Sequence, residues 1–270
     1  MDSGIGQNGL RFMKMHGLGN DFVVIDARGG GAMPDAETVR RLGDRHRGVG
    51  FDQLAVVTGV EGGEAGLVFF NSDGSESAAC GNATRCIGRW LLDLTGKDEL
   101  FLKTERGLLA IERAGELTRV NMGLPSTAWD EIPLSEQCDT DHLPIEGDPV
   151  ATSMGNPHCT FFVDDALAVD LETRGPEVEH HPLFPQRTNV QFVSRLGPDH
   201  LRMRVWERGA GVTLASGSSS CAVCVAAVRR GITGHAITLD CDGGRLWVEW
   251  REDGVWMTGP TAHVFDGVLA

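Results

Sequence analysis

The 270-residue chain is expected to fold as an α+β protein of two pseudo-symmetric domains, each a mainly antiparallel sheet around a central helix. Three observations predict this. Short β-rich runs outnumber helical patterns along the chain. A Gly-rich polar loop that leads into a helical pattern occurs twice, at residues 71–82 and 207–218. The two copies are 136 residues apart, which indicates an internal repeat.

The repeat extends beyond these loops at the same spacing. The matched pairs are Cys80 with Ser216, Gly81 with Gly217, Asn71 with Glu207, Gln53 with Asn189, and Asn20 with Asn156. We therefore predict an N-terminal half over residues 1–127 and a C-terminal half over residues 128–261, with the active site in the cleft between them. The last apolar run, at about 262–270, is expected to return to the N-terminal half.

In the N-terminal half, apolar alternation and turn residues predict short strands, and a 3.6-residue periodicity predicts two helices. The helix that follows the first Gly-rich loop should end at Thr95 and Gly96, because glycine favours a left-handed helix cap. The expected strands are 12–16, 22–26, 54–58, 67–70, 100–104, 108–113 and 117–122, and the expected helices are 35–46 and 81–95.

In the C-terminal half, the same patterns recur after residues 125–148, a stretch rich in Pro, Asp and Glu that is interpreted as the crossing between the halves. The helix that begins at Gly217 should end near Arg229, where cations suit the last turn. The expected strands are 151–153, 159–163, 190–193, 201–206, 236–239, 245–251, 254–258 and 262–269, and a second helix is expected at 172–178.

Composition excludes several classes of partner. The net charge of −14, from 38 acidic and 24 basic residues, argues against nucleic-acid and anionic-membrane surfaces. No apolar run has transmembrane length, and the N-terminus lacks a signal-peptide pattern. Seven scattered cysteines suit a reducing compartment. We therefore expect a soluble, cytoplasmic protein, and the sequence leaves its oligomeric state open, with a homodimer as one option.

No cofactor or metal is expected. A pyridoxal phosphate enzyme needs a Schiff-base lysine, and the three lysines, Lys14, Lys97 and Lys103, lie outside the Gly-rich loops. The Cys221-x-x-Cys224 pair lacks a second pair of ligands at zinc spacing and lies within a helical pattern, as does Cys86, so these cysteines are interpreted as core residues. The doublet at residues 180–181 is interpreted as a solvated loop.

Cys80 is the sharpest chemical feature of the sequence, because it follows a polar loop and begins a helix. A helix N-terminus lowers the pKa of a thiol and provides backbone N–H groups that bind anions. Polar residues at the matched positions would suit a small zwitterion as ligand. Arg208 would bind a carboxylate with two hydrogen bonds, and Glu207 would accept from an ammonium group. These residues are Asn20, Gln53, Asn71, Asn82, Asn156, Asn189, Glu207 and Arg208.

Seven motifs, in order from about Met13 to the C-terminus, resemble the diaminopimelate epimerase family. They are Gly17-Leu18-Gly19-Asn20-Asp21-Phe22, Gly50-Phe51-Asp52-Gln53, Phe70-Asn71-Ser72-Asp73-Gly74-Ser75, Cys80-Gly81-Asn82, Gly155-Asn156-Pro157-His158, Thr188-Asn189-Val190 and Trp206-Glu207-Arg208-Gly209. The resemblance implies epimerisation of LL- to meso-diaminopimelate without a cofactor. In that family two cysteines act on opposite faces of the α-carbon, one as base and one as acid.

The resemblance also implies a role for each matched residue. Cys80 is one of the two catalytic residues, and Ser216 occupies the position of the second cysteine. His158 and Glu207 match polar groups close to the cysteines. The carboxylate at the reacting carbon would be held by Gly81, Asn82, Gly217 and Ser218, and the distal end by Asn71, Asn156, Asn189, Glu207 and Arg208, with Asn20 and Gln53 as further binding positions.

Ser216 is a departure from the family pattern. A serine hydroxyl is a far weaker acid than a thiol, and no adjacent base in the sequence activates it. Either an engineered Cys-to-Ser change or natural divergence would explain it. Three activities are therefore open: weakened diaminopimelate epimerisation, racemisation or isomerisation of another amino acid on the same fold, and amino-acid binding without catalysis.

Overall fold

The computed structural model describes residues 9–31, 33–61, 64–77 and 80–269. The chain divides into two compact units. Unit 1 comprises Met1–Thr118 and Thr261–Ala270, and unit 2 comprises Arg119–Pro260. This division lies within a strand at residues 118 and 119, whereas the sequence placed the boundary in the polar segment after residue 127.

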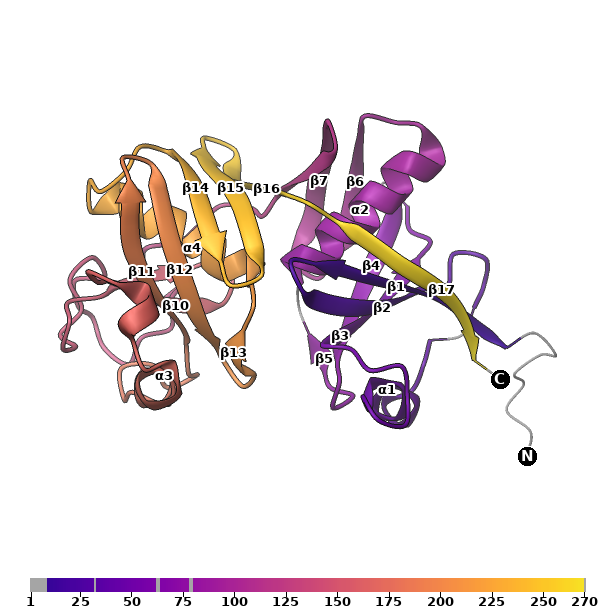
Figure 1. Ribbon diagram of the computed structural model, residues 1–270, viewed down its shortest axis with the longest axis horizontal. Helices are drawn as coiled ribbons and strands as arrows, with labels where there is room; N and C mark the ends of the chain where they lie inside the picture. Colours follow the sequence, from indigo (N-terminus) through magenta and orange to yellow (C-terminus); the bar gives the residue numbers. More distant parts are fainter. Residues whose placement is uncertain (1–8, 32, 62–63, 78–79, 270) are drawn as a thin grey trace. The chain divides into compact units, whose positions relative to one another are not determined.

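Unit 1 is a mixed, mainly antiparallel sheet with two helices. Its strands pair in the order β17–β1–β2–β3–β4–β6–β7, and the short β5 pairs with β4. In Figure 1, β17 (yellow) lies beside β1 (indigo), as their antiparallel register requires. The elements are β1 (Leu10–Gly17), β2 (Asn20–Asp26), α1 (Ala36–Gly43), β3 (Gln53–Thr58), β4 (Ala65–Asn71), β5 (Glu76–Ser77), α2 (Gly81–Thr95), β6 (Glu99–Thr104), β7 (Gly107–Ala114) and β17 (Ala262–Leu269).

Unit 2 repeats this arrangement, with strand order β9–β10–β11–β12–β14–β15–β16, β8 pairing with β16, and β13 pairing with β12. The elements are β8 (Leu117–Asn121), β9 (Val150–Ser153), β10 (Pro157–Phe162), the 3₁₀ helix η1 (Ala166–Ala168), α3 (Leu171–Glu179), β11 (Asn189–Gly197), β12 (His200–Glu207), β13 (Gly211–Thr213), α4 (Gly217–Arg229), β14 (Ala236–Cys241), β15 (Gly244–Arg251) and β16 (Gly254–Gly259).

The strand registers show that the repeat is structural. In unit 1, β2 and β3 run parallel with Phe22 beside Gln53, and in unit 2, β10 and β11 run parallel with His158 beside Asn189, each residue 136 positions later. The antiparallel pairs β3–β4 and β11–β12 keep the same offset. The predicted fold class of two pseudo-symmetric α+β halves is therefore confirmed.

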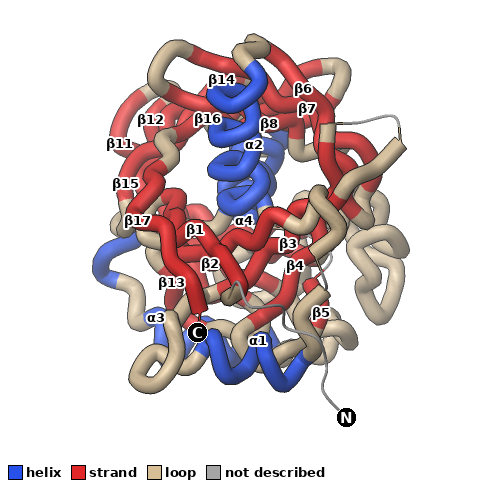
Figure 2. The backbone as a smooth tube through the Cα atoms, turned by 90° about the vertical axis from the view of Figure 1, so that its right-hand side faces the viewer, coloured by secondary structure: helices blue, strands red, loops and turns tan. Residues whose placement is uncertain are grey.

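Each sheet packs a central helix on one face. The helix α2 contacts β1, β2, β6 and β7, and α4 contacts the corresponding strands of unit 2. Figure 2 shows both helices in blue among red strands. Gly96 ends α2 in a left-handed conformation, with its N–H donating to the carbonyl of Leu92, as the sequence predicts. The helix α4 is the more deeply buried, because small and branched apolar residues cover all its faces.

The opposite faces carry the second core clusters. In unit 1, Val39 and Leu42 of α1 pack on the apolar residues of β2 and β3. The expected helix over 35–46 is shorter in the structure, where α1 ends at Gly43 and Asp44 caps it in an extended conformation. Because Asp44 uses its side chain to accept from the N–H groups of residues 46 and 47, the chain turns there.

Residues 125–148, which the sequence analysis interprets as the crossing between the halves, lie within unit 2, because the units divide at residues 118 and 119. They bury four apolar side chains, Ile132, Leu134, Leu143 and Ile145, against the core cluster of β10, β11 and α3. An isolated bridge joins Ser126 to Ser153 of β9. The polar composition concealed this role, because isolated apolar residues between turns have no periodicity to detect.

Candidate active site

Cys80 is the N-cap residue of α2. Its backbone is extended (φ −145°), and its Sγ accepts a hydrogen bond from the N–H of Ala83 at 3.4 Å. The side chain is 8% exposed. The hydroxyl of Thr84 donates to the Cys80 carbonyl at 2.8 Å, which fixes the residue at the start of the helix. The thiol therefore lies at the helix N-terminus, where the helix dipole gives a positive potential.

A directional chain of hydrogen bonds leads away from this helix end. The buried Arg85 donates to the Oδ1 of Asn82 at 2.8 Å, and the Nδ2 of Asn82 donates to the Oδ1 of Asn20 at 3.2 Å. The Nδ2 of Asn20 then donates to Asp52 at 2.8 Å. The structure thus brings Asn20 and Asn82 together, and it adds Arg85, which the sequence analysis missed because arginine within a helix is usually exposed.

Gln53 and Asn71 form a second polar group in unit 1. They face each other across β3 and β4, and the Nε2 of Gln53 donates to the Oδ1 of Asn71 at 3.2 Å and to the Oγ of Ser77 at 3.2 Å. The Nδ2 of Asn71 donates to Ser75 at 3.0 Å. These bonds orient both amides at the end of the sheet, next to the loop that leads to Cys80.

Ser216 is the N-cap of α4 and is 3% exposed. Its extended backbone (φ −132°) matches that of Cys80, and the hydroxyl of Ser220 donates to its carbonyl at 2.7 Å, as Thr84 does to Cys80. Among the described residues, however, its own hydroxyl makes no capping bond to α4. Gly217 and Ser218 begin the helix, where backbone N–H groups have no partner within the helix.

Asn156 connects this helix end to β10. Its Nδ2 lies 3.4 Å from the Oγ of Ser218, and its Oδ1 lies 3.0 Å from the Nε2 of His158. The Nδ1 of His158 lies 3.1 Å from the Nε2 of Gln191 on β11. His158 is fully buried, and its two ring nitrogens face the amides of Asn156 and Gln191.

Glu207 is the last residue of β12, and Arg208 begins the loop that follows it. The backbone N–H of Arg208 donates to the Oδ1 of Asn189 at 3.0 Å, and its guanidinium donates to the carbonyl of Gln186 at 3.2 Å. Glu207 accepts from the hydroxyl of Thr213 at 2.6 Å. Arg208 is exposed as a residue, yet partial burial of its guanidinium lowers its pKa, and repulsion from Arg187 lowers it further.

Glu179, which the sequence analysis placed next to a solvated loop, is instead buried at 3% exposure. Its Oε2 accepts from the indole Nε1 of Trp206 at 2.6 Å, and its Oε1 accepts from the N–H of Gly209 at 2.9 Å. The equivalent residue of unit 1, Gly43, lies close to the loop that follows β4. A Cβ atom added to this glycine would lie 3.0 Å from the carbonyl oxygen of Ser72. The end of α3 therefore holds the loop of Arg208 in place.

The other candidates have structural roles. His180 Nδ1 lies 2.9 Å from the Pro176 carbonyl, and His181 accepts from the N–H of Leu183 at 3.2 Å. Burial raises the pKa of the Cys86 thiol to about 11 and that of Cys224 to about 12. Within the ranges that the structure describes, no cluster of three or more His, Cys, Asp and Glu side chains could hold a metal ion.

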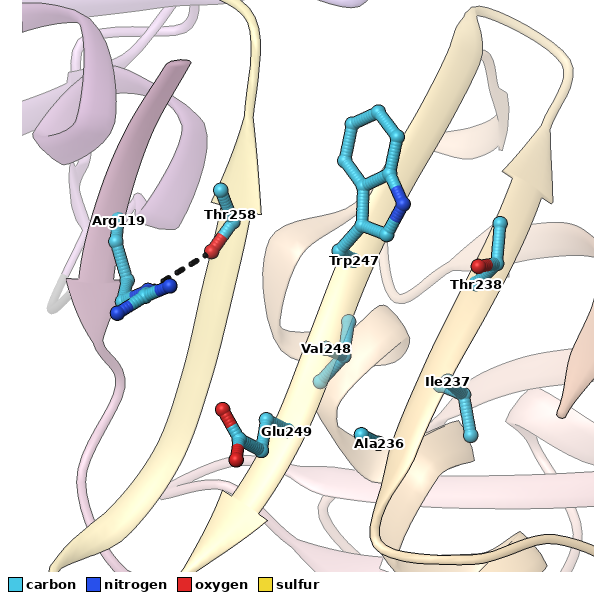
Figure 3. A pocket seen from close by; sticks show the side chains of 8 residues that line it. All are labelled: Arg119, Ala236, Ile237, Thr238, Trp247, Val248, Glu249 and Thr258. Carbon is cyan, nitrogen blue, oxygen red and sulfur yellow. Dashed lines mark hydrogen bonds between the residues drawn. The ribbon is translucent and has the colours of Figure 1, made fainter. Parts of the chain in front are cut away.

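A small pocket lies on the sheet of unit 2, over β14, β15, β16 and β8 (Figure 3). Arg119 donates to the hydroxyl of Thr258 at 3.3 Å along one wall, and Trp247 and Glu249 stand on the strand beside them. None of the predicted site residues lines this pocket, so it is separate from the candidate site. No helix among the described residues is long and apolar enough to cross a membrane.

Known proteins match this chain over nearly its whole length. The family model "Diaminopimelate epimerase" matches residues 12–128 and 150–264. The diaminopimelate epimerase of Rhodospirillum centenum is 51% identical over 268 residues, covering 96% of this chain and 92% of the relative. That of Acidiphilium cryptum is 49% identical, covering 96% of this chain and 95% of the relative.

Solved structures share the fold at low identity. The phenazine biosynthesis protein of the PhzF family from Bacillus anthracis has a TM-score of 0.70 at 16% identity, covering 98% of this chain and 100% of that one. A predicted epimerase from Pseudomonas aeruginosa has a TM-score of 0.69 at 18% identity, covering 96% and 99%. The family model matches both halves of the chain, and the two relatives are 51% and 49% identical to it in sequence. The resemblance seen in the motifs is therefore confirmed, and the chain belongs to the diaminopimelate epimerase family.

Proposed function

We propose that this chain interconverts LL- and meso-diaminopimelate by moving a proton at the α-carbon, with no cofactor. The observation that carries the proposal is the equivalent placement of Cys80 and Ser216 as extended N-cap residues of α2 and α4. Two relatives named diaminopimelate epimerase, at 51% and 49% identity, support the same substrate. The mechanism requires these two residues to reach opposite faces of one α-carbon.

Cys80 is assigned as the base. As a thiolate it removes the α-hydrogen, and the electron pair left on carbon is delocalised into the substrate carboxylate. Backbone N–H groups at a helix N-terminus stabilise this developing negative charge. We assign this role to Gly81 and Asn82 in α2 and to Gly217 and Ser218 in α4, which are the first residues of their helices.

Inversion is complete only when a second group delivers a proton to the other face. Ser216 occupies that position, and a serine hydroxyl is a much weaker acid than a thiol. Delivery from Ser216 would leave an alkoxide that must regain a proton from solvent before the next turnover. We therefore assign weak epimerisation to this chain, with the second proton transfer as the slow step.

The distal amino-acid group of the substrate is assigned to the polar residues of the sheet ends. Arg208 is the carboxylate ligand, because a guanidinium that is crowded by Arg187 and partly buried gains most from an anion. Glu207 accepts from the distal ammonium. Amide groups complete the set, from Asn71, Asn156 and Asn189, with Asn20 and Gln53 as further binding positions.

A thiolate base has to stay reduced, which suits a cytoplasmic enzyme.

The test of the function is an assay of the purified chain on LL-diaminopimelate, with the meso isomer quantified by chiral chromatography. Slow formation of meso isomer, with no racemisation of L-lysine or L-alanine, would support the proposal. Faster racemisation of a monocarboxylic amino acid would establish a different racemase, and binding with no turnover would establish a binding protein.

A further inference from the structure

Four fully buried polar side chains form a network beneath the N-terminus of α4. The Thr160 hydroxyl donates to the Oε1 of Gln191 at 3.0 Å. The Nε2 of Gln191 lies 3.1 Å from the Nδ1 of His158 and donates to the Oγ of Ser219 at 3.0 Å. All four residues have 0% exposure. Residues alternate between faces along a strand, so Thr160, His158 and Gln191 face α4, where Ser219 lies.

The orientation of the Gln191 amide sets the direction of each bond in this network. Because the Gln191 carbonyl accepts from Thr160, its amide nitrogen faces His158. The Nδ1 of His158 must then accept, which places the ring proton on Nε2 in a neutral imidazole. The Nε2–H faces the Oδ1 of Asn156 at 3.0 Å, so the Asn156 amide directs its NH₂ group toward Ser218 at the start of α4.

The other half of the molecule shows that this fold does not need such a network. At the four equivalent positions, 136 residues earlier, unit 1 has Phe22, Val24, Ala55 and Ala83, which are all fully buried. The strand registers on which this correspondence depends are the same in both units. Buried polar groups are costly unless every one is satisfied, so a purely structural role would be served by the apolar set.

We propose that Thr160 and Gln191 are positioning residues: they hold His158 as the neutral Nε2–H tautomer, and through it they orient the Asn156 NH₂ group for the distal carboxylate of the substrate. The part of this inference that concerns the substrate (the substrate half) rests on the proposed function. The part that concerns the tautomer of His158 (the tautomer half) does not. In this state the Nδ1 lone pair of His158 is already used. His158 therefore acts as a hydrogen-bond relay and not as a base for Ser216.

The tautomer is measured in the unliganded protein by NMR with ¹⁵N-labelled histidine, and the His158→Asn variant assigns the ring signals. A protonated Nε2 with an unprotonated Nδ1 at pH 7 is the expected result. Gln191→Glu should give a ring protonated on both nitrogens, because a carboxylate at Nδ1 favours the imidazolium. An Nδ1–H tautomer or a charged ring in the unaltered protein would overturn the inference.

Binding of diaminopimelate, measured by calorimetry, tests the second half. Thr160→Val places in β10 the residue found at position 24 of β2, and it frees the Gln191 amide to turn. The affinity should fall about tenfold as the Asn156 hydrogen bond to the distal carboxylate is lost. The Gln191→Glu variant should bind diaminopimelate with an affinity close to that of the unaltered protein and no lower than that of Thr160→Val. The reason is that an imidazolium still donates from its Nε2 to Asn156.

Thr118→Val is the matched control, because Thr118 is a buried threonine whose hydroxyl has no hydrogen-bond partner among the described residues. It should leave the affinity unchanged. Equal affinities for Thr160→Val and the unaltered protein, or an equal loss in Thr118→Val, would overturn the positioning role. If the unaltered protein binds no diaminopimelate, the proposed function fails together with the substrate half, and the NMR result alone decides the tautomer.

Discussion

Cys80 and Ser216 occupy the same backbone position in two equivalent helices, and only Cys80 caps its helix with its own side chain. Serine is among the preferred N-cap residues, because its hydroxyl can accept a hydrogen bond from the first turn of a helix. Since the Ser216 hydroxyl makes no such bond to α4, its position does not serve helix stability. This favours a role toward a ligand at the start of α4. It also defines the asymmetry of the chemistry, because a thiol stands at one helix end and an alcohol at the other.

Restoring a thiol at position 216 should therefore increase turnover. Ser216→Cys is expected to raise the rate of meso-diaminopimelate formation by about 10²- to 10⁴-fold, which is the usual contribution of a positioned acid–base group. Chiral chromatography of the product measures the rate. The double variant Ser216→Cys with Cys80→Ala should fall back to background. Equal rates for Ser216→Cys and the unaltered chain would show that residue 216 does not carry the second proton.

The same asymmetry predicts a one-sided isotope exchange. In deuterated water, the epimer whose α-hydrogen faces Cys80 should incorporate deuterium faster than it epimerises, because the thiol exchanges with solvent and returns a deuteron to the same face. The other epimer should incorporate little. Mass spectrometry of each epimer gives the rates, and Cys80→Ala should abolish the exchange while Cys138→Ala keeps it. Exchange at equal rates in both epimers would point to another base.

Arg208 should discriminate substrates by their second carboxylate. Arg208→Lys replaces a planar fork with a point charge, so the dissociation constant for diaminopimelate should rise by about tenfold or more. Calorimetry measures the change, and Arg195→Lys, an exposed arginine that donates to the Gly197 carbonyl, is the control. Tight binding of L-lysine or L-alanine to the unaltered chain would contradict the assignment of Arg208 to a distal carboxylate.

Glu179 should be important for stability although it lies at the end of a short helix. In Glu179→Gln, the amide NH₂ would face either the indole N–H of Trp206 or the N–H of Gly209, both of which are donors. The free energy of unfolding should fall by about 2 kcal/mol, the cost of an unsatisfied buried group. Urea denaturation measures it, and Glu177→Gln, on the exposed side of α3, should change stability by less than about 0.5 kcal/mol.

The buried Cys86 thiol should make stability sensitive to alkaline pH. Burial raises its pKa from 9.0 to about 11. Because the folded-state pKa lies above the unfolded one, this stabilisation is fully present below about pH 9 and is lost as pH rises to about 11, by roughly 2–3 kcal/mol at 1.36 kcal/mol per pKa unit. The stability difference between the unaltered protein and Cys86→Ala should therefore be constant at pH 7–8 and shrink above pH 9, as measured by urea denaturation. A difference that stays constant to pH 11 would contradict the buried thiol.

The sequence by itself determined the repeat, the fold class, the placement of Cys80 and Ser216 at helix N-termini, and the family. These features are local or periodic: glycine-rich loops before helical patterns, and motifs at a constant spacing of 136 residues. Local patterns predict these features correctly because the ends of helices and strands are determined by residues close to them in the sequence. The polar residues chosen from the motifs are likewise found at or near strand ends and helix starts.

Only the tertiary structure decided which polar groups are buried and what they bond. Thr160 and Gln191 fall within predicted strands, Arg85 falls within a predicted helix, and Glu179 precedes the doublet interpreted as a solvated loop, so none of them was a candidate site residue. Arg85 bonds Asn82 within its own helix, but the partners of the other three lie 27 to 33 residues away in the chain and become neighbours only through sheet pairing and helix packing. The physical reason is that burial depends on what packs against a side chain, and a sequence pattern reports the side chain alone.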